Sequence, residues 1–175
     1  MVETLDRRCA LIEMLILDVD GVLTDGSIVY GDRGEELKAF HVRDGSGLKV
    51  WLQLGKWAGI ITGRTSSVVE RRAHELGVSL LAQGAEDKQA AYERMLGEQE
   101  VARTQVCFVG DDLPDLPHLR QSGLAVAVAD ACDDVKRAAH HVTRAAGGRG
   151  AVREVIELIL RSQGRWREVV ARYGG

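Results

Sequence analysis

Short apolar runs recur along the chain, and each of them ends in small or polar residues. Continuous apolar runs are typical of strands that are covered on both faces, as in a parallel sheet. Six segments have this character and are predicted as strands: 14–17, 58–61, 79–81, 106–109, 124–128 and 141–143. Segments with apolar residues three and four positions apart are predicted as helices: 48–54, 66–76, 89–96, 116–122, 133–139 and 151–160. This alternation predicts an α/β fold with a single Rossmann-like, doubly wound parallel sheet.

Residues 27–42 interrupt this alternation directly after the first predicted strand. Extended residues flank the turn at 31–34, a pattern typical of a β-hairpin, so we expect a hairpin flap over about 27–42. The length of 175 residues leaves room for one domain, 1–175, without a cap domain. The segment 161–175 carries four arginines against one glutamate, and we expect a basic, frayed C-terminal tail.

The composition excludes several classes of function. A formal net charge of −3 gives no overall attraction to nucleic acid or to an anionic membrane. The apolar stretch 11–19 is interrupted by Glu13 and Asp18, which makes it too short and too charged for a membrane span or signal. Three cysteines without CxxC spacing predict a reducing, cytoplasmic location and no zinc site.

The strongest chemical signal is the pair Asp18 and Asp20 at the end of the first predicted strand. Residues two apart in an extended chain point the same way, and ligands bind at the carboxyl ends of parallel strands. Two such acids can divide the work, one as nucleophile or metal ligand and the other as proton donor. An isolated pair of this kind is more often a solvated acidic turn.

The pair does not stand alone. Further polar groups follow other predicted strands or open a predicted helix: Thr62, Gly63, Arg64, Lys88, Asp111 and Asp112, with Asp115 one turn later. Several carboxylates at one sheet edge are costly unless a divalent cation neutralises them, and their hard oxygens suit Mg²⁺. Taken singly, these residues are helix caps and surface charges. Their order at successive strand ends indicates a site for phosphate and Mg²⁺.

Six segments together carry a family resemblance: 18–26 (DVDGVLTDG), 40–47 (FHVRDGSG), 61–64 (ITGR), 110–115 (GDDLPD), 128–131 (VADA) and 147–154 (GGRGAVRE). They resemble the motifs of the haloacid dehalogenase superfamily of phosphohydrolases, in its capless subclass. The closer similarity is to the 3-deoxy-D-manno-octulosonate 8-phosphate (KDO 8-phosphate) phosphatases, over about 15–163. Ser46 stands where many relatives carry an aromatic residue, so the contacts of that ring are not carried over.

The resemblance implies a Mg²⁺-dependent phosphatase that releases phosphate from KDO 8-phosphate in lipopolysaccharide precursor synthesis. Asp18 would attack phosphorus and form an aspartyl-phosphate, and Asp20 would protonate the leaving oxygen and then activate water. The implied metal ligands are Asp18, the backbone carbonyl of Asp20 and Asp111, with Asp112 acting through water. The implied phosphate and substrate residues are Thr62, Gly63, Arg64 and Lys88.

Two other functions stay open at this point. The first is a phosphatase of a nine-carbon keto-sugar acid 9-phosphate, although relatives of that kind tend to carry an acid at the position of Arg64. The second is a non-enzymatic receiver domain that holds a phosphoryl group on an aspartate. A nucleophile in the first strand, with a second acid two residues later, favours turnover over a long-lived phosphate.

Other segments carry weaker expectations. Arg43 and Asp44 are expected near the entrance of the site, and His118 on a helix surface. Residues 147–150 form either an anion-binding nest or a glycine-rich start of the last helix. The motif spacing leaves no room for a cap, so a neighbouring subunit is expected to close the site. Members of the resembled family are typically tetramers, and we expect a homotetramer with the hairpin at the interface.

Overall fold

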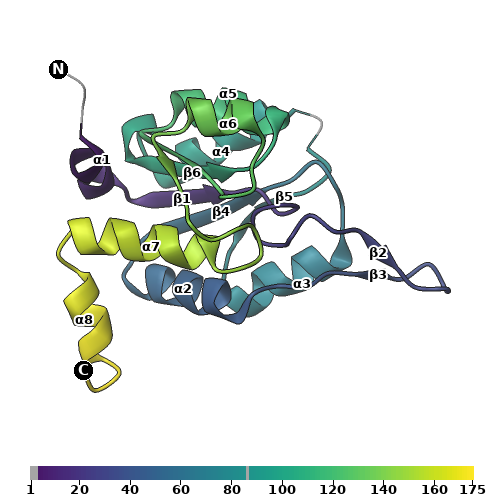
Figure 1. The fold of residues 1–175 in the computed structure, drawn as a ribbon, viewed down its shortest axis with the longest axis horizontal. Helices are drawn as coiled ribbons and strands as arrows, with labels where there is room; N and C mark the ends of the chain where they lie inside the picture. Colours follow the sequence, from purple (N-terminus) through teal and green to yellow (C-terminus); the bar gives the residue numbers. More distant parts are fainter. Residues whose placement is uncertain (1–3, 86) are drawn as a thin grey trace.

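The computed structural model describes residues 4–85 and 87–175. Its six parallel strands form one sheet in the order β5-β4-β1-β6-β7-β8. Figure 1 labels four of them, β5, β4, β1 and β6. Their bounds are β1 (Met14–Leu17), β4 (Trp57–Ile61), β5 (Leu80–Ala82), β6 (Val106–Gly110), β7 (Leu124–Ala127) and β8 (His141–Val142). Each strand lies within one residue of its predicted bounds. The prediction of a doubly wound parallel sheet is confirmed.

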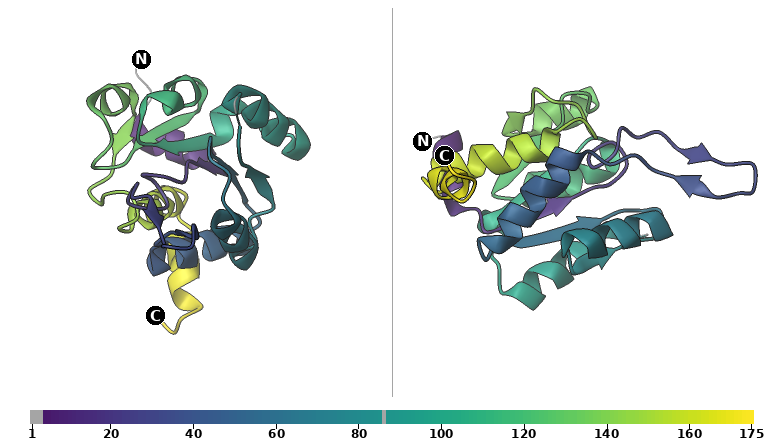
Figure 2. Two further views of the ribbon diagram at one scale, coloured as in Figure 1. Left: turned by 90° about the vertical axis from the view of Figure 1, so that its right-hand side faces the viewer. Right: turned by 90° about the horizontal axis from the view of Figure 1, so that it is seen from below.

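Helices cover both faces of the sheet. They are α1 (Leu5–Leu11), α2 (Val42–Gln53), α3 (Ser67–Leu76), α4 (Lys88–Gln99), α5 (Leu116–Gln121), α6 (Asp133–Ala138), α7 (Ala151–Ser162) and α8 (Trp166–Ala171). Helices α2, α3 and α7 lie on one face, and α4, α5 and α6 lie on the other (Figures 1 and 2). All four residues of β1 are fully buried between these layers. Because β1 lies between β4 and β6, three strand ends meet at the centre of one sheet edge.

The predicted hairpin is confirmed as a short two-stranded sheet. Strand β2 (Val29–Tyr30) pairs antiparallel with β3 (Glu36–Leu37), and the turn closes through a 2.8 Å hydrogen bond from Gly31 N to Glu35 O. The hairpin projects beyond the sheet edge (Figure 2). Residues 4–85 and 87–175 contain no cap domain, so the hairpin is what overhangs this edge.

Helix α2 begins at residue 42, six residues before its predicted start. The early part of α2 contains Gly45 and Gly47, which disfavour a helix when the sequence is considered alone. A Cβ atom at either position would come within about 3 Å of side chains on α3 or α7. The two glycines therefore allow close helix packing, which compensates for their poor helix propensity.

The prediction of a frayed tail from residue 161 onward is wrong as far as residue 171. Helix α7 continues to Ser162, and α8 follows with Val169 only 3% exposed. The guanidinium carbon atoms of Arg153 and Arg161 lie 5.0 and 5.2 Å from the centre of the Trp166 ring. These apolar residues give the basic segment a buried face against its own chain.

Asp44 does not line the site entrance, as was expected, but caps a helix. It is 1% exposed and accepts hydrogen bonds from Gly150 N at 3.2 Å and Arg153 N at 2.7 Å. One carboxylate on α2 thus satisfies two N–H groups at the start of α7.

Replacing Asp44 with alanine is expected to lower the free energy of unfolding by about 2 kcal/mol, because two buried N–H groups lose their acceptor. Urea unfolding followed by circular dichroism measures the change. Asp134→Ala, at an exposed aspartate, is the control and should change stability by less than about 0.5 kcal/mol. Equal stabilities for the two variants would contradict the capping role.

Candidate active site

A tight loop after β1 places Asp18 and Asp20 at the sheet edge. The carbonyl oxygen of Val19 accepts the backbone N–H groups of residues 22, 23 and 24, which folds the chain back on itself. Gly21 has φ +96°, and a Cβ atom there would overlap the carboxylate of Asp111. The glycine is therefore required both by the turn and by the close approach of Asp111.

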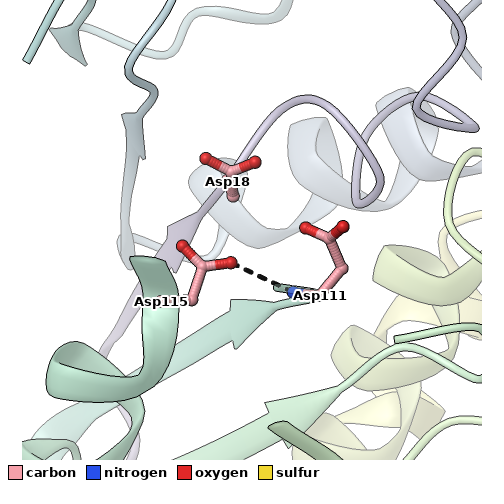
Figure 3. A group of neighbouring side chains, drawn as sticks. All are labelled: Asp18, Asp111 and Asp115. Carbon is pink, nitrogen blue, oxygen red and sulfur yellow. Dashed lines mark hydrogen bonds between the residues drawn. The ribbon is translucent and has the colours of Figure 1, made fainter. Parts of the chain in front are cut away.

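Three carboxylates gather at this edge. Asp18 follows β1, Asp111 follows the adjacent β6, and Asp115 ends the short 3₁₀ helix Leu113–Asp115. Each offers one oxygen atom, and these oxygens lie within 4.8 Å of one another (Figure 3). The N–H of Asp111 donates to Asp115 Oδ2 at 3.0 Å, which orients Asp115. Asp115 is a site residue that was predicted only as part of a motif.

Lys88 supplies the positive charge of this cluster. It is the first residue of α4, whose start is capped by Asp87 Oδ1 accepting from Gln89 N and Ala90 N. Its Nζ lies 2.8 Å from Asp18 Oδ1 and 3.0 Å from Asp115 Oδ1. One ammonium therefore faces three carboxylates, and the cluster retains an excess of negative charge.

The excess charge is reflected in the acidities of the buried groups. Burial, followed by the charge of Asp115, raises the pKa of Asp18 to about 6. Burial and the charges of Asp18 and Asp115 raise the pKa of Asp111 to about 7. Burial acts to lower the pKa of Lys88. The negative charges of Asp18 and Asp115 outweigh this effect, so the pKa of Lys88 is raised. Carboxylate oxygens in excess over cations are the donor set that suits Mg²⁺, so these residues fit the ion.

Mg²⁺ is expected to raise the melting temperature more at about pH 8 than at about pH 5.5. The native carboxyls have higher pKa values than the unfolded value of about 3.9, so the metal-free fold binds extra protons between these values. Its stability therefore falls as the pH rises toward 7. Mg²⁺ binds the ionised carboxylates, and its stabilisation grows over the same window.

Scanning calorimetry with and without Mg²⁺ measures this effect. Asp111→Asn is the matched variant and should lose most of the Mg²⁺-induced shift at both pH values. A shift of equal size at both pH values in the unmodified protein would contradict a site formed by these acids.

The predicted phosphate residues line the same cavity as the acids. A cavity of about 560 Å³ is bordered by Asp18, Asp20, Lys88 and the segment 62–64. Thr62 follows β4 and is 3% exposed, and its backbone N–H donates to Ala82 O on β5. Arg64 lies at the cavity wall, and its side chain is 41% exposed. The structure thus brings all of the predicted site residues to one edge of the sheet.

The side chain of Asp20 lies outside the carboxylate cluster. Lys38 Nζ forms an ion pair with Asp20 Oδ1, and Arg64 Nε lies 3.7 Å from Asp20 Oδ2. Arg64 also contacts Glu36 and Tyr30 Oη, both at 3.1 Å. These hairpin residues were not predicted as site residues. The spacing of Glu36 and Lys38, two apart in an extended segment, was the available signal.

Of the two alternatives for residues 147–150, the structure supports the glycine-rich start of α7 and not the anion-binding nest. The four N–H groups of this segment donate to Asp130 Oδ1, Val22 O, Ala146 O and Asp44 Oδ2. Cβ atoms at Gly147 and Gly148 would collide with the backbone of the Asp18–Asp25 loop. The glycines are there because two backbone segments approach closely, and the segment supports the Asp18–Asp25 loop without binding an anion.

The prediction that His118 lies on a helix surface is also wrong. It is 3% exposed and stacks on Phe108 with ring centroids 5.2 Å apart. The sequence predicted an exposed residue because histidine is polar. In the structure its ring instead packs at the cavity wall as an aromatic group.

Among the helices that the structure describes, none combines the length and the apolar character needed to span a membrane.

Comparison with known proteins gives a consistent family. A haloacid dehalogenase-like hydrolase family model matches residues 78–156. The chain is 50% identical to the KDO 8-phosphate phosphatase of Yersinia pestis over 90% of the chain and 84% of that protein. It is 51% identical to the enzyme of the same name from Escherichia coli K12, over 88% of the chain and 82% of that protein.

Solved structures agree with this similarity. The KDO 8-phosphate phosphatase of Moraxella catarrhalis, crystallised with a magnesium ion, a phosphate ion and KDO, has a TM-score of 0.93. It is 40% identical to the chain, with 96% of the chain and 97% of that structure covered. A probable phosphatase from Pseudomonas syringae has a TM-score of 0.94 at 44% identity, with 97% of both chains covered.

Proposed function

The chain belongs to the KDO 8-phosphate phosphatases of the haloacid dehalogenase-like hydrolases, and on this premise we propose that it hydrolyses KDO 8-phosphate to KDO and inorganic phosphate. It is a phosphoric monoester hydrolase. The observation that carries the proposal is the grouping of Asp18, Asp111 and Lys88 in one cavity, with Asp20 at its border. The reaction would supply free KDO to lipopolysaccharide precursor synthesis.

In the proposed reaction Asp18 is the nucleophile. Its carboxylate attacks phosphorus, and the bond from phosphorus to the sugar oxygen breaks as the aspartyl-phosphate forms. Asp20 donates a proton to the departing sugar oxygen, then accepts one from the water that hydrolyses the intermediate. Lys88 already contacts Asp18, so its ammonium is placed to bind the phosphoryl oxygens, together with Thr62.

The residues that would hold Mg²⁺ are Asp18 and Asp111, with the backbone carbonyl of Asp20 as a third ligand and Asp112 through water. When bound, the ion offsets the gathered negative charge of the carboxylates and the phosphate. Asp115 has a different task, because its two oxygens accept from Lys88 and from Asp111 N. It fixes these two residues relative to each other.

The substrate choice rests on Arg64. The family substrate carries a carboxylate as well as a phosphate, and a partly exposed guanidinium at the cavity wall suits bidentate carboxylate binding. A phosphatase of the nine-carbon keto-acid 9-phosphates is the alternative, and an acid at this position would favour it.

Steady-state phosphate release tests the proposed substrate. The eight-carbon and nine-carbon phosphates are compared with and without Mg²⁺. We expect kcat/KM for KDO 8-phosphate to exceed that for the nine-carbon substrate by about tenfold or more, and to need Mg²⁺. The opposite order would assign the alternative substrate, and phosphate retained on the protein without release would favour a receiver.

We propose that the active form is a cytoplasmic homotetramer of one-domain chains. Four side chains of the hairpin are 47–63% exposed although they are apolar or aromatic: Ile28, Val29, Tyr30 and Leu37. An isolated two-stranded hairpin is marginally stable, and such residues favour contact with another copy. A neighbour there would also cover the open cavity. The cysteines described in the structure are unpaired, which supports a reducing compartment.

The double variant Val29→Asp/Leu37→Asp is expected to dissociate the tetramer, because these paired residues place two new charges on the exposed hairpin face. Size-exclusion chromatography with light scattering measures the mass. Leu11→Asp, at an apolar residue that is 49% exposed on α1, is the control and should leave the mass unchanged. A double variant with the mass of four chains would place the interface elsewhere.

A further inference from the structure

The hairpin contributes a buried lysine to the active site. Lys38 follows β3, and its side chain is 1% exposed although the hairpin projects from the sheet edge (Figure 2). Its ammonium pairs with Asp20 Oδ1 and lies 3.5 Å from Glu36 Oε1. Burial of an ammonium is costly unless carboxylates pair with it. The carboxylates of Asp20 and Glu36 therefore explain how the ammonium of Lys38 can be buried at this position.

Arg64 closes the arrangement into a ring. Its Nη2 lies 3.1 Å from the same Glu36 oxygen, and its Nε lies 3.7 Å from Asp20 Oδ2. Cations and carboxylates alternate around this ring, and each oxygen of Asp20 faces one cation. Three of the four side chains are at most 19% exposed, which limits screening by water. Residues of the hairpin thus orient the carboxyl group of Asp20, which lies on the loop after β1.

From this geometry we propose that Lys38 is a positioning residue, which holds the carboxyl of Asp20 where it serves the leaving-group oxygen. The proposal rests on the proposed function, in which Asp20 is the general acid. Proton transfer needs the two oxygens within hydrogen-bond reach, and a carboxyl that rotates freely spends less time there. Lys38 acts through Asp20 and has no direct contact with the reacting phosphorus.

The nature of the leaving group separates this role from a general weakening of the site. The sugar oxygen of a sugar phosphate is a poor leaving group, and it needs a proton from Asp20 as its bond to phosphorus breaks. p-Nitrophenyl phosphate releases p-nitrophenolate, a stable anion that needs no proton to leave. Loss of Asp20 positioning therefore slows aspartyl-phosphate formation selectively for the sugar phosphate, whereas the later attack of water on this intermediate is common to both substrates. Loss of Mg²⁺, of phosphate binding or of folding slows both.

The experiment compares Lys38→Met with the wild-type protein, the full chain in each case, at saturating Mg²⁺. The substrates are KDO 8-phosphate, D-arabinose 5-phosphate as a second alkyl phosphate, and p-nitrophenyl phosphate. We expect kcat/KM, which reports the steps up to aspartyl-phosphate formation, to fall by about 10²-fold for the two alkyl phosphates and by less than about fivefold for p-nitrophenyl phosphate. Lys38→Arg should restore most of the loss. Lys49→Met, at an exposed lysine on α2, is the matched control and should behave as wild type.

Equal losses of kcat/KM on all three substrates, or no loss on any of them, would overturn the role of Lys38. Retained p-nitrophenyl phosphate hydrolysis also demonstrates that the variant is folded. A wild-type protein that hydrolyses the other two substrates but not KDO 8-phosphate would contradict the proposed substrate alone, and the Lys38 comparison would stand on D-arabinose 5-phosphate. A wild-type protein that releases no phosphate from any substrate would overturn both.

Discussion

Replacing Asp18 with asparagine is expected to lower kcat by roughly 10⁴-fold or more while leaving the fold intact. The carboxamide has nearly the same shape as the carboxylate but does not attack phosphorus. It also removes one charge from a cluster in which a single ammonium faces three carboxylates. The melting temperature of the metal-free variant should therefore not fall below that of the wild type at about pH 8.

Phosphate release and scanning calorimetry together test this expectation. Asp134→Asn, at an exposed aspartate of α6, controls for the loss of a carboxylate elsewhere and should retain full activity. An Asp18→Asn variant with undiminished phosphate release would remove Asp18 from the chemistry. A large fall in its melting temperature would instead indicate that the carboxylate mainly stabilises the fold.

Replacing Asp20 with asparagine is expected to slow the hydrolysis of KDO 8-phosphate by about 10²–10⁴-fold. The amide neither protonates the sugar oxygen nor accepts a proton from water. With p-nitrophenyl phosphate the first step needs no proton, so only the second step is slowed. Rapid mixing should then give a burst of p-nitrophenolate that approaches one equivalent per site, followed by a slow steady rate.

The wild-type protein is the comparison for the burst and should give a smaller one. A variant without a burst, whose steady rate falls equally on both substrates, would contradict the two-step role of Asp20. It would instead favour a purely structural role within the ring formed with Lys38 and Arg64.

The sheet and most of the candidate site are predictable because their signals are local. Each strand is a continuous apolar run, and the residue that follows its end is brought to a shared edge by the parallel topology. Asp18, Thr62 and Asp111 follow strands in this way, and Lys88 opens a helix at the same edge. No knowledge of tertiary contacts is needed to place them together.

The features that escaped prediction depend on contacts between distant segments. Lys38 is a site residue only because the hairpin folds back onto the loop that carries Asp20. Gly147 owes its presence to the backbone of Gly21, more than a hundred residues away. His118 is a polar residue whose burial follows from stacking on Phe108. Periodicity and composition contain none of this information.

The identity of the phosphorylated residue tests the account most directly. Asp20→Asn is mixed with p-nitrophenyl phosphate and Mg²⁺, quenched during the burst, reduced with borohydride to convert any aspartyl-phosphate into homoserine, and digested for mass spectrometry. We predict homoserine at position 18 and at no other aspartate. Labelling at Asp111 or Asp115, or no labelling despite a full burst, would contradict the assignment of Asp18 as the nucleophile.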